Sequence, residues 1–209
     1  MLMKLFVENE LKILITEELY QDIFRQAFQH GAKTMVQTNH YFDTSDFYVT
    51  GEKMSLRIRE KNNEYMLTLK VGRKKAGQFQ SSDEYNKALE NEQALSVIHG
   101  MQPIESLLND FPLKNVIRKE RALLYKGYMV TKRTSYMPVE GLNPLELDQN
   151  VYLGMQDYEL EWEYDQQEQY KAILDWLKQQ NIHTTSLMTR SKFGRFMERL
   201  IALKEHSLP

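Results

Sequence analysis

The sequence predicts a fold of the α+β class, in which about eight antiparallel strands can close into a barrel and a few helices pack outside it. Two observations favour this class. Apolar and charged residues alternate along most of the chain, as they do in half-buried strands. A few other stretches follow helical spacing instead. The 209 residues contain no repeat and no linker-like change in composition, so we expect a single domain over 1–209.

The first predicted strand spans residues 4–15, where apolar and charged residues alternate. Thr16 follows it and can cap a helix, because its side-chain oxygen can accept a hydrogen bond from a free N–H of the first turn. An acidic residue, Glu17, follows the cap, and Gly31 comes after the last residue with helical spacing. These signals predict a helix between Thr16 and Gly31.

The same alternation predicts the remaining strands. Asn62-Asn63 favours a tight turn between two of them, and we expect Gly127 to separate another pair. The predicted strands after the first are 38–44, 53–61, 63–72, 76–89, 115–127, 128–137, 144–154 and 157–164. Helical spacing predicts helices over 89–99, 103–110, 166–180 and 190–204.

The composition limits the possible classes of function. A net charge of −2 and a pI of about 6.2 provide no global basic field, so we expect no nucleic acid among the partners. The chain has no cysteine, which excludes disulfides and thiolate chemistry. Acidic residues follow too soon after the start for a signal peptide, and no apolar run approaches the ~18 residues of a membrane helix. We therefore expect a cytoplasmic protein without a membrane partner, and the sequence leaves its oligomeric state open.

Most of the predicted strands place their charged residues on one face. In "LRIRE", for example, Leu56 and Ile58 oppose Arg57 and Arg59. The helices must cover the apolar faces, so the charged faces all turn to the other side of the sheet. If the sheet closes, that side becomes a lumen lined with acids and bases. The alternative is that each charged face is solvated, which is common in antiparallel sheets.

Acids gather near the two ends of the chain and bases between them. The acids are Glu8, Glu10, Glu159 and Glu161, and the bases are Arg57, Arg59, Lys70, Lys119 and Arg121. Carboxylates brought together would suit a hard cation such as Mg²⁺ or Mn²⁺, which prefers oxygen ligands. Cations brought together would suit a polyanion, and the arginine fork matches phosphate oxygens. The pattern therefore indicates a metal ion and a phosphate-rich ligand.

The segment "ENELK" (8–12) has the form Glu-x-Glu-x-Lys and resembles the signature of the CYTH family, the triphosphate tunnel metalloenzymes. Later segments resemble family landmarks in the family's order: "YFDT" (41–44), "LRIR" (56–59), "TLK" (68–70), "RKER" (118–121), "LD" (147–148) and "ELE" (159–161). The resemblance spans about residues 5–200 and is greatest for the short, stand-alone bacterial members.

The resemblance implies an eight-stranded antiparallel tunnel that binds a divalent metal. The residues that it implies as ligands of Mg²⁺ or Mn²⁺ are Glu8, Glu10, Asp148, Glu159 and Glu161. The residues that it implies as phosphate contacts are Lys12, Arg57, Arg59, Lys70, Lys119 and Arg121, with catalytic roles for Glu8, Glu10 and Lys12. Glu84 shares a charged face, and Lys192 opens the last helix and could reach a tunnel mouth. Both are candidate substrate contacts, although each could instead be solvated.

The activity that the resemblance implies is divalent-metal-dependent hydrolysis of an inorganic, nucleoside or thiamine triphosphate. The partner is then a small-molecule triphosphate or polyphosphate. The chain lacks the Gly-x-x-x-x-Gly-Lys-Ser/Thr loop that would offer a competing phosphate site. Two alternatives stay open: a class IV adenylate cyclase, which would use the same cations and metal, and a non-catalytic protein that binds polyphosphate or nucleotides. The presence of all four glutamates counts against the second alternative, and the lack of a recognisable base pocket favours hydrolysis.

Overall fold

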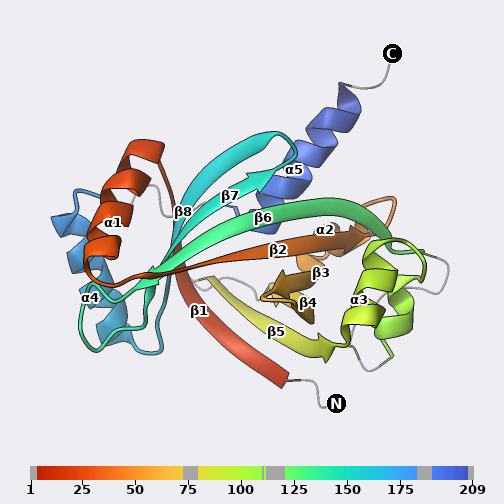
Figure 1. Ribbon diagram of the computed structural model, residues 1–209, viewed down its shortest axis with the longest axis horizontal. Helices are drawn as coiled ribbons and strands as arrows, with labels where there is room; N and C mark the ends of the chain where they lie inside the picture. The colour runs from red at the N-terminus through yellow and green to blue at the C-terminus, as the bar shows by residue number, and fades with distance from the viewer. Residues whose placement is uncertain (1–3, 73–79, 110, 112–120, 183–189, 207–209) are drawn as a thin grey trace.

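The strands form a closed antiparallel barrel (Figure 1). The computed structural model describes residues 4–72, 80–109, 111, 121–182 and 190–206, and the side chains of 4–8, 80 and 81 lie outside this description. The strand order is β1-β5-β4-β3-β2-β6-β7-β8, and β1 pairs with β5 on one side and with β8 on the other. The predicted α+β class with an eight-stranded antiparallel barrel is therefore confirmed. The strands are β1 (Lys4–Ile15), β2 (Lys33–Asp43), β3 (Met54–Lys61), β4 (Glu64–Gly72), β5 (Gln80–Leu89), β6 (Leu124–Tyr136), β7 (Leu145–Tyr152) and β8 (Met155–Glu163).

Helices lie at both ends of the barrel, with α1 and α4 at one end and α3 at the other (Figure 1). They are α1 (Glu17–Gln29), α2 (Tyr48–Gly51), α3 (Asn91–Ile98), the 3₁₀ helix η1 (Ile104–Leu107), α4 (Gln167–Gln179) and α5 (Lys192–Glu205). In the described part of the chain, none of the helices combines the length and the apolar character needed to cross a membrane.

The outward faces of the strands are buried in two separate hydrophobic cores. Leu56 of β3 and Leu67 of β4 belong to one core, together with Val97 of α3. Leu160 of β8 belongs to the other, together with Ile173 of α4 and several residues of α1. The helices α1, α3 and α4 therefore cover the outside of the barrel, and the alternation along each strand turns its polar residues inward.

The last helix, α5, packs differently. Its Phe193 and Phe196 contact Tyr41 of β2 and Met129 of β6 in a third core. Tyr41 is paired with Arg57 in the sheet and so faces inward, opposite to the neighbouring Phe42 of the outer core. The start of α5 therefore packs against the inner face of the barrel, while α1, α3 and α4 pack against its outer face.

The predicted strand boundary at Gly127 is wrong. The strand β6 continues through Gly127 and pairs with β2 on one side and β7 on the other. Tyr41 pairs with Gly127 whereas the next residue, Phe42, pairs with Tyr125, so Lys126 is an extra residue in a β-bulge. Gly127 has φ of +124° and bends the strand without reversing it. Residues 112–120, which include the start of the predicted strand 115–127, lie outside the described residues.

Other local predictions are confirmed, with shifted ends. The side chain of Thr16 accepts a hydrogen bond from the Leu19 amide at 3.3 Å, as a helix cap does. Asn62 and Asn63 have φ of 53° and 61°, which a tight hairpin turn of the I′ type requires at both positions. The extended piece predicted at 38–44 is part of a longer strand, β2, and the helix predicted at 103–110 is the short η1. Residues 73–79, the start of the strand predicted at 76–89 among them, lie outside the described residues.

We predict that Gly127→Ala destabilises the fold by about 2 kcal/mol. A Cβ at this position would lie 3.1 Å from Cζ of Phe196, and the backbone conformation disfavours any side chain. Urea denaturation of the variant and the wild type measures this loss. Gly51→Ala is the control, because a Cβ at Gly51 would meet no atom within 4 Å. Equal stability of Gly127→Ala and the wild type would contradict the prediction.

Candidate functional site

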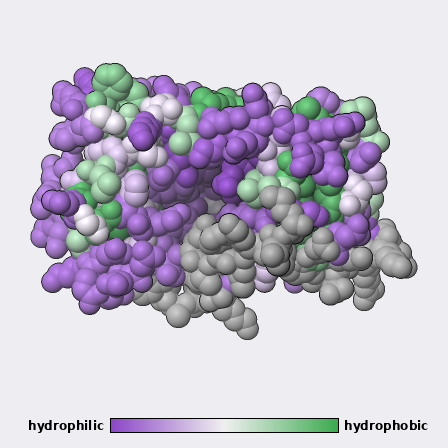
Figure 2. Space-filling model, turned by 60° about the horizontal axis from the view of Figure 1, so that its bottom comes forward, coloured by the Kyte–Doolittle hydropathy of each residue, from purple (hydrophilic) through white to green (hydrophobic). Residues whose placement is uncertain are grey.

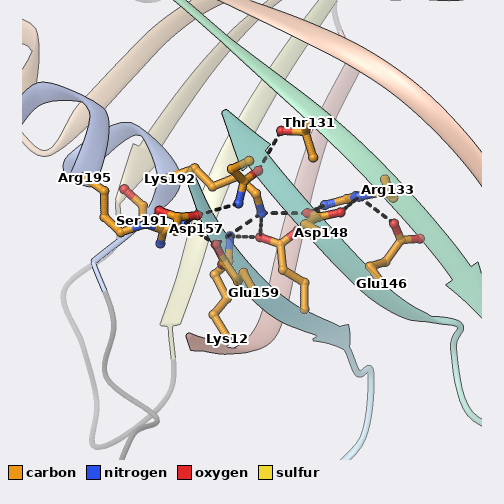
Figure 3. A network of polar contacts seen from close by, with 12 residues as sticks. Lys12, Thr131, Arg133, Glu146, Asp148, Asp157, Glu159, Ser191, Lys192 and Arg195 are labelled. Carbon is orange, nitrogen blue, oxygen red and sulfur yellow. Dashed lines mark hydrogen bonds and ion pairs between the residues drawn. The ribbon is translucent and has the colours of Figure 1, made fainter. Parts of the chain in front are cut away.

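The inner faces of β7 and β8 carry five carboxylates that are buried or half-buried, which we call the acid wall: Glu146, Asp148, Asp157, Glu159 and Glu161. Asp148 lies opposite Glu159 in the sheet, and Glu146 lies opposite Glu161. Residues at facing positions of paired strands point to the same side, so the side chains gather inside the barrel (Figure 3). Asp148 and Glu159 are both 0% exposed. Because a buried carboxylate is costly without compensation, the acid wall needs counter-charges.

Lys12 of β1 supplies one counter-charge and joins two strands. Its ammonium lies 3.0 Å from Glu10 on the same strand and 2.7 Å from Glu161 on β8. The other oxygen of Glu10 accepts a hydrogen bond of 3.1 Å from Lys70 of β4. The signature residues Glu10 and Lys12 therefore connect the acid wall to the basic residues across the barrel.

Lys192, the first residue of α5, supplies a second counter-charge and is buried, not solvated. Its ammonium lies 2.8 Å from Asp148, 2.7 Å from Glu161 and 3.4 Å from Glu159. These contacts are ion pairs whose angles do not meet those of directed hydrogen bonds. Three carboxylates thus surround one small cation (Figure 3).

Two arginines supply further counter-charges to the carboxylates of the acid wall. Arg133 of β6 donates to both oxygens of Asp148, at 2.8 and 2.6 Å, and also contacts Glu146 and Glu161. Arg195 of α5 donates to Asp157 of β8 at 2.8 Å and to the neighbouring acid Glu159 at 2.5 Å. The planar guanidinium suits such two-carboxylate contacts better than a lysine does.

Our reading of the sequence missed both arginines, although signals for them exist. Arg133 lies two residues after Thr131 and two residues before Ser135. All three side chains therefore lie on the same face of β6, the inner face. Arg195 lies three residues after Lys192, on the same side of the helix. The missing information was that the start of α5 packs against the inside of the barrel.

Glu159 and Glu161, at adjacent inward positions of β8, have pKa values that are shifted in opposite directions. Burial would raise the pKa of Glu161, but the charges of Lys12, Lys192 and Arg133 outweigh burial and hold that pKa well below its usual value. Burial raises the pKa of Glu159, and the charges of Lys192, Lys12 and Arg195 only partly offset it. Glu161 is therefore the more firmly ionised of the two, and Glu159 is the acid with the less complete compensation.

The basic residues of β3 and β4 surround Glu84 of β5. The Glu84 carboxylate lies 3.9 Å from both Arg57 and Lys70 and accepts a hydrogen bond of 2.9 Å from Asn86. Arg59 lies two residues after Arg57 on the same face of β3. Burial would raise the pKa of Glu84, but Arg57 and Lys70 outweigh it and the pKa is lowered. The structure thus brings this acid and these bases together on the inner face.

Three predicted site residues are not placed in this network. Arg121 lies 3.1 Å from Asp46, with its guanidinium 4.5 Å from the centre of the Tyr48 ring, and its side chain is 39% exposed. Lys119 lies outside the described residues. Glu8 lies in β1 opposite Ser82, and its side chain is outside the description.

The basic residues of β3 and β4 on the inner face are more exposed than the carboxylates that surround Lys192. The side chain of Lys70 is 25% exposed and that of Arg57 is 20% exposed, whereas Asp148 and Glu159 are 0% exposed. Figure 2 shows a hollow lined by hydrophilic residues in the middle of one face of the molecule.

The donor set of the acid wall fits a divalent cation. Oxygens of Asp148, Glu159 and Glu161 already surround the ammonium of Lys192, and carboxylate oxygens are what Mg²⁺ and Mn²⁺ prefer. The oxygen Oε1 of Glu159 is buried and has no hydrogen-bond donor. Within the described residues, no cluster of three or more Asp, Glu or His side chains is free to hold a metal ion, since lysines lie between the carboxylates. A metal ion would therefore have to replace an ammonium group.

An antiparallel barrel with facing sets of acids and bases on its inner surface defines a charged β-tunnel, a class of protein suited to polyanions. The CYTH domain family matches residues 7–191. This chain belongs to the CYTH family, and the resemblance seen in the sequence is confirmed.

Known proteins resemble the chain over nearly its whole length. It is 32% identical to the Bacillus subtilis protein named "Putative triphosphatase YjbK", over 92% of this chain and 95% of that protein. A "putative adenylate cyclase" from Bacillus halodurans has a similar structure, with a TM-score of 0.74, 28% identity and coverage of 92% and 98% of the two chains. HpAC1 from Hippeastrum, described as a "putative adenylyl cyclase" with "a dominant" triphosphatase activity, has a TM-score of 0.74 at 26% identity, covering 91% of this chain and 95% of that chain.

We predict that Glu84→Gln lowers stability at pH 7 and that the difference is smaller at pH 3. The lowered pKa means that ionised Glu84 stabilises the fold above its ordinary pKa of about 4.5, and that this stabilisation is lost as the pH falls through the folded-state value. Urea denaturation at both pH values, without metal or phosphate, measures the difference. Glu64→Gln, at an exposed position on β4, is the control. A difference of the same size at pH 3 would contradict the prediction.

Proposed function

We propose that this protein is a divalent-metal-dependent triphosphatase that binds a triphosphate inside its barrel. The observation that carries the proposal is the contact of Lys12 with both Glu10 and Glu161, because Glu10 also contacts Lys70 and so links the acid wall to the basic residues of the barrel. A metal ion needs the carboxylates and a phosphate chain needs the cations, and the reaction needs the two groups next to each other. The names of two similar proteins, which mention triphosphatases, support the same activity.

We assign the metal to three members of the acid wall together with two glutamates of β1, and the substrate to the bases. The proposed ligands of Mg²⁺ or Mn²⁺ are Glu8, Glu10, Asp148, Glu159 and Glu161. When bound, such an ion neutralises phosphate charge and lowers the pKa of a water that it holds. Arg57, Arg59 and Lys70 contact the phosphate oxygens in this proposal, and Glu84 orients Arg57 and Lys70. For Lys119 and Arg121 a phosphate contact rests on the family motif alone.

Lys12 and Lys192 change partners in this proposal. Each ammonium lies within 3 Å of acid-wall carboxylates, where a divalent cation and an ammonium would repel each other. Entry of a metal ion therefore releases the lysines, which are then free to contact phosphate oxygens. The contacts of Lys192 are ion pairs without directed geometry, so they constrain its position less than the arginine forks constrain theirs.

The reaction proposed is attack of water on the terminal phosphorus. The oxygen of water forms the new bond, the bond from phosphorus to the bridging oxygen breaks, and the products of tripolyphosphate are orthophosphate and diphosphate. Glu8 or Glu10 orients the water and takes up its proton, and the cations stabilise the charge on the leaving diphosphate. We propose one domain over residues 1–209 and a cytoplasmic location, where nucleotides and polyphosphates are available.

We predict phosphate release from a triphosphate only in the presence of a divalent metal ion. The panel is tripolyphosphate, ATP and thiamine triphosphate, each with Mg²⁺, with Mn²⁺ and with excess chelator. Cyclic AMP is measured in parallel with ATP. Full activity in chelator would exclude a metal ion bound at the acid wall. Cyclic AMP as the main product from ATP would show that the reaction is cyclisation and not hydrolysis.

We predict that Glu161→Gln and Arg59→Ala impair activity in different ways. The first removes a charge from the acid wall, so the metal concentration for half activity should rise. The second removes a proposed phosphate contact, so activity at saturating metal should fall by roughly 30- to 1000-fold, which corresponds to ~2–4 kcal/mol. Metal and substrate titrations of each variant measure these effects.

Two control variants accompany these changes. Glu163→Gln removes the next inward acid of β8, which is exposed, and Arg25→Ala removes a base on α1 whose side chain is 73% exposed. Both controls should behave as the wild type does. Wild-type titrations for Glu161→Gln and Arg59→Ala would show that neither residue contributes to a triphosphate site.

A further inference from the structure

Arg195 of α5 makes the shortest contact of any described cation with Glu159. Its Nη2 atom lies 2.5 Å from Oε2 of Glu159, whereas the ammonium of Lys192 lies 3.4 Å from the same oxygen. Arg195 is itself buried, and the proposed function gives it no role. Its contact with Glu159 therefore deserves a functional explanation, because it links the last helix to the acid wall.

The two oxygens of Glu159 have different surroundings. Oε2 faces both Arg195 and Lys192, but Oε1 is buried and has no hydrogen-bond donor. A buried oxygen without a donor destabilises the fold, so native proteins keep few of them. The side chain of Glu159 is 0% exposed, which prevents bulk water from compensating Oε1. Such an oxygen suits a cation that arrives later.

The orientation of Arg195 is fixed from three directions. Its guanidinium donates to Asp157 at 2.8 and 3.3 Å and to the carbonyl oxygen of Arg190 at 2.7 Å. The helix around it is anchored by Phe193 and Phe196, which pack in the core at the barrel mouth. The guanidinium therefore holds Glu159 from a rigid support (Figure 3).

We propose that Arg195 is a positioning residue that fixes Glu159 through Oε2, so that Oε1 is presented to the divalent cation of the acid wall. The inference rests on the proposed function only in requiring that a divalent cation binds there. Carboxylates that ligate metals are commonly held by a second hydrogen-bonding partner, and loss of that partner typically costs 10- to 100-fold in metal affinity or activity. Arg195 thus makes the docking of α5 a condition for metal binding.

Arg195 and Lys192 differ in what metal binding does to them. Lys192 occupies the space between three carboxylates, and its ammonium must leave when a cation enters. Arg195 contacts Glu159 on the oxygen opposite to the free one and is held by Asp157 as well. It can therefore remain in place while Oε1 acquires a ligand.

The test is calorimetric titration of the purified protein with Mn²⁺ alone, without substrate. Arg195→Gln should bind Mn²⁺ about 10- to 100-fold more weakly than the wild type. Arg195→Lys keeps the charge but cannot span Asp157 and Glu159 with one planar group, so its affinity should lie between the two. Arg199→Gln is the matched control, because Arg199 lies one turn further along α5 and donates to the carbonyl oxygen of Leu153, away from the acid wall.

A double-variant cycle separates positioning from a general structural role. If Arg195 acts through Glu159, then Arg195→Gln should add no further loss of Mn²⁺ affinity in a Glu159→Gln background. An equal loss in both backgrounds would overturn the proposal, since Arg195 would then act by another route. Should Arg195→Gln not fold, the same cycle is measured with Arg195→Lys.

The outcomes distinguish this inference from the proposed function. Wild-type Mn²⁺ affinity in Arg195→Gln, or in folded Arg195→Lys where Gln does not fold, overturns the positioning role alone. Absence of Mn²⁺ binding by the wild type overturns the metal-dependent function and this inference together. Weakened binding in the Arg195 variants, with Arg199→Gln unchanged and no added loss in the Glu159→Gln background, supports the positioning role.

Discussion

The pairing of β1 with both β5 and β8 is the constraint on which the rest of the structure depends. It closes the sheet, and closure separates an inner face from an outer one. It also places Glu10 and Lys12 between the acids of β8 and the bases of β4, so that Lys12 contacts Glu161 and Lys70 contacts Glu10. Without this pairing the acids and bases would lie on distant edges of an open sheet and would be solvated separately.

Closure buries the inner charges, which costs desolvation free energy, and the network of ion pairs offsets that cost. Burial alone would raise the pKa of Glu161, yet Lys12, Lys192 and Arg133 reverse the effect. Removing one partner of such a network leaves a buried charge, which is far more destabilising than never having built the pair. Apolar side chains would fill the same space at lower cost, so a role in ligand binding, as proposed above, gives a reason for keeping the charged groups inside.

The two kinds of cation in the network suit different tasks. Arg133 and Arg195 hold carboxylates with planar forks whose geometry is fixed by several partners at once. Lys12 and Lys192 provide compact charges on flexible side chains, which suits groups that must change partners. The helix α5 contributes one of each kind from a single turn, and its apolar residues fix that turn at the barrel mouth.

Local patterns in the sequence were sufficient to predict most of the helices and strands and most of the charged faces. The alternation in β3 places Arg57 and Arg59 opposite Leu56 and Ile58, because successive side chains of a strand point to opposite sides. The hairpin turn at Asn62-Asn63 was equally local, because asparagine tolerates the positive φ that the turn needs. These features depend on the backbone and on neighbouring residues only.

The tertiary structure alone decided which charges meet. Gly127 reads as a turn residue, and only the pairing of β6 with β2 shows that it forms a bulge which leaves room for Phe196. From the sequence, Lys192 could be either a contact at a tunnel mouth or a solvated lysine, and only the docking of α5 buries it together with Arg195. Contacts such as that between Arg195 and Glu159, 36 residues apart in the chain, depend on strand register and on helix docking, and no local periodicity encodes either.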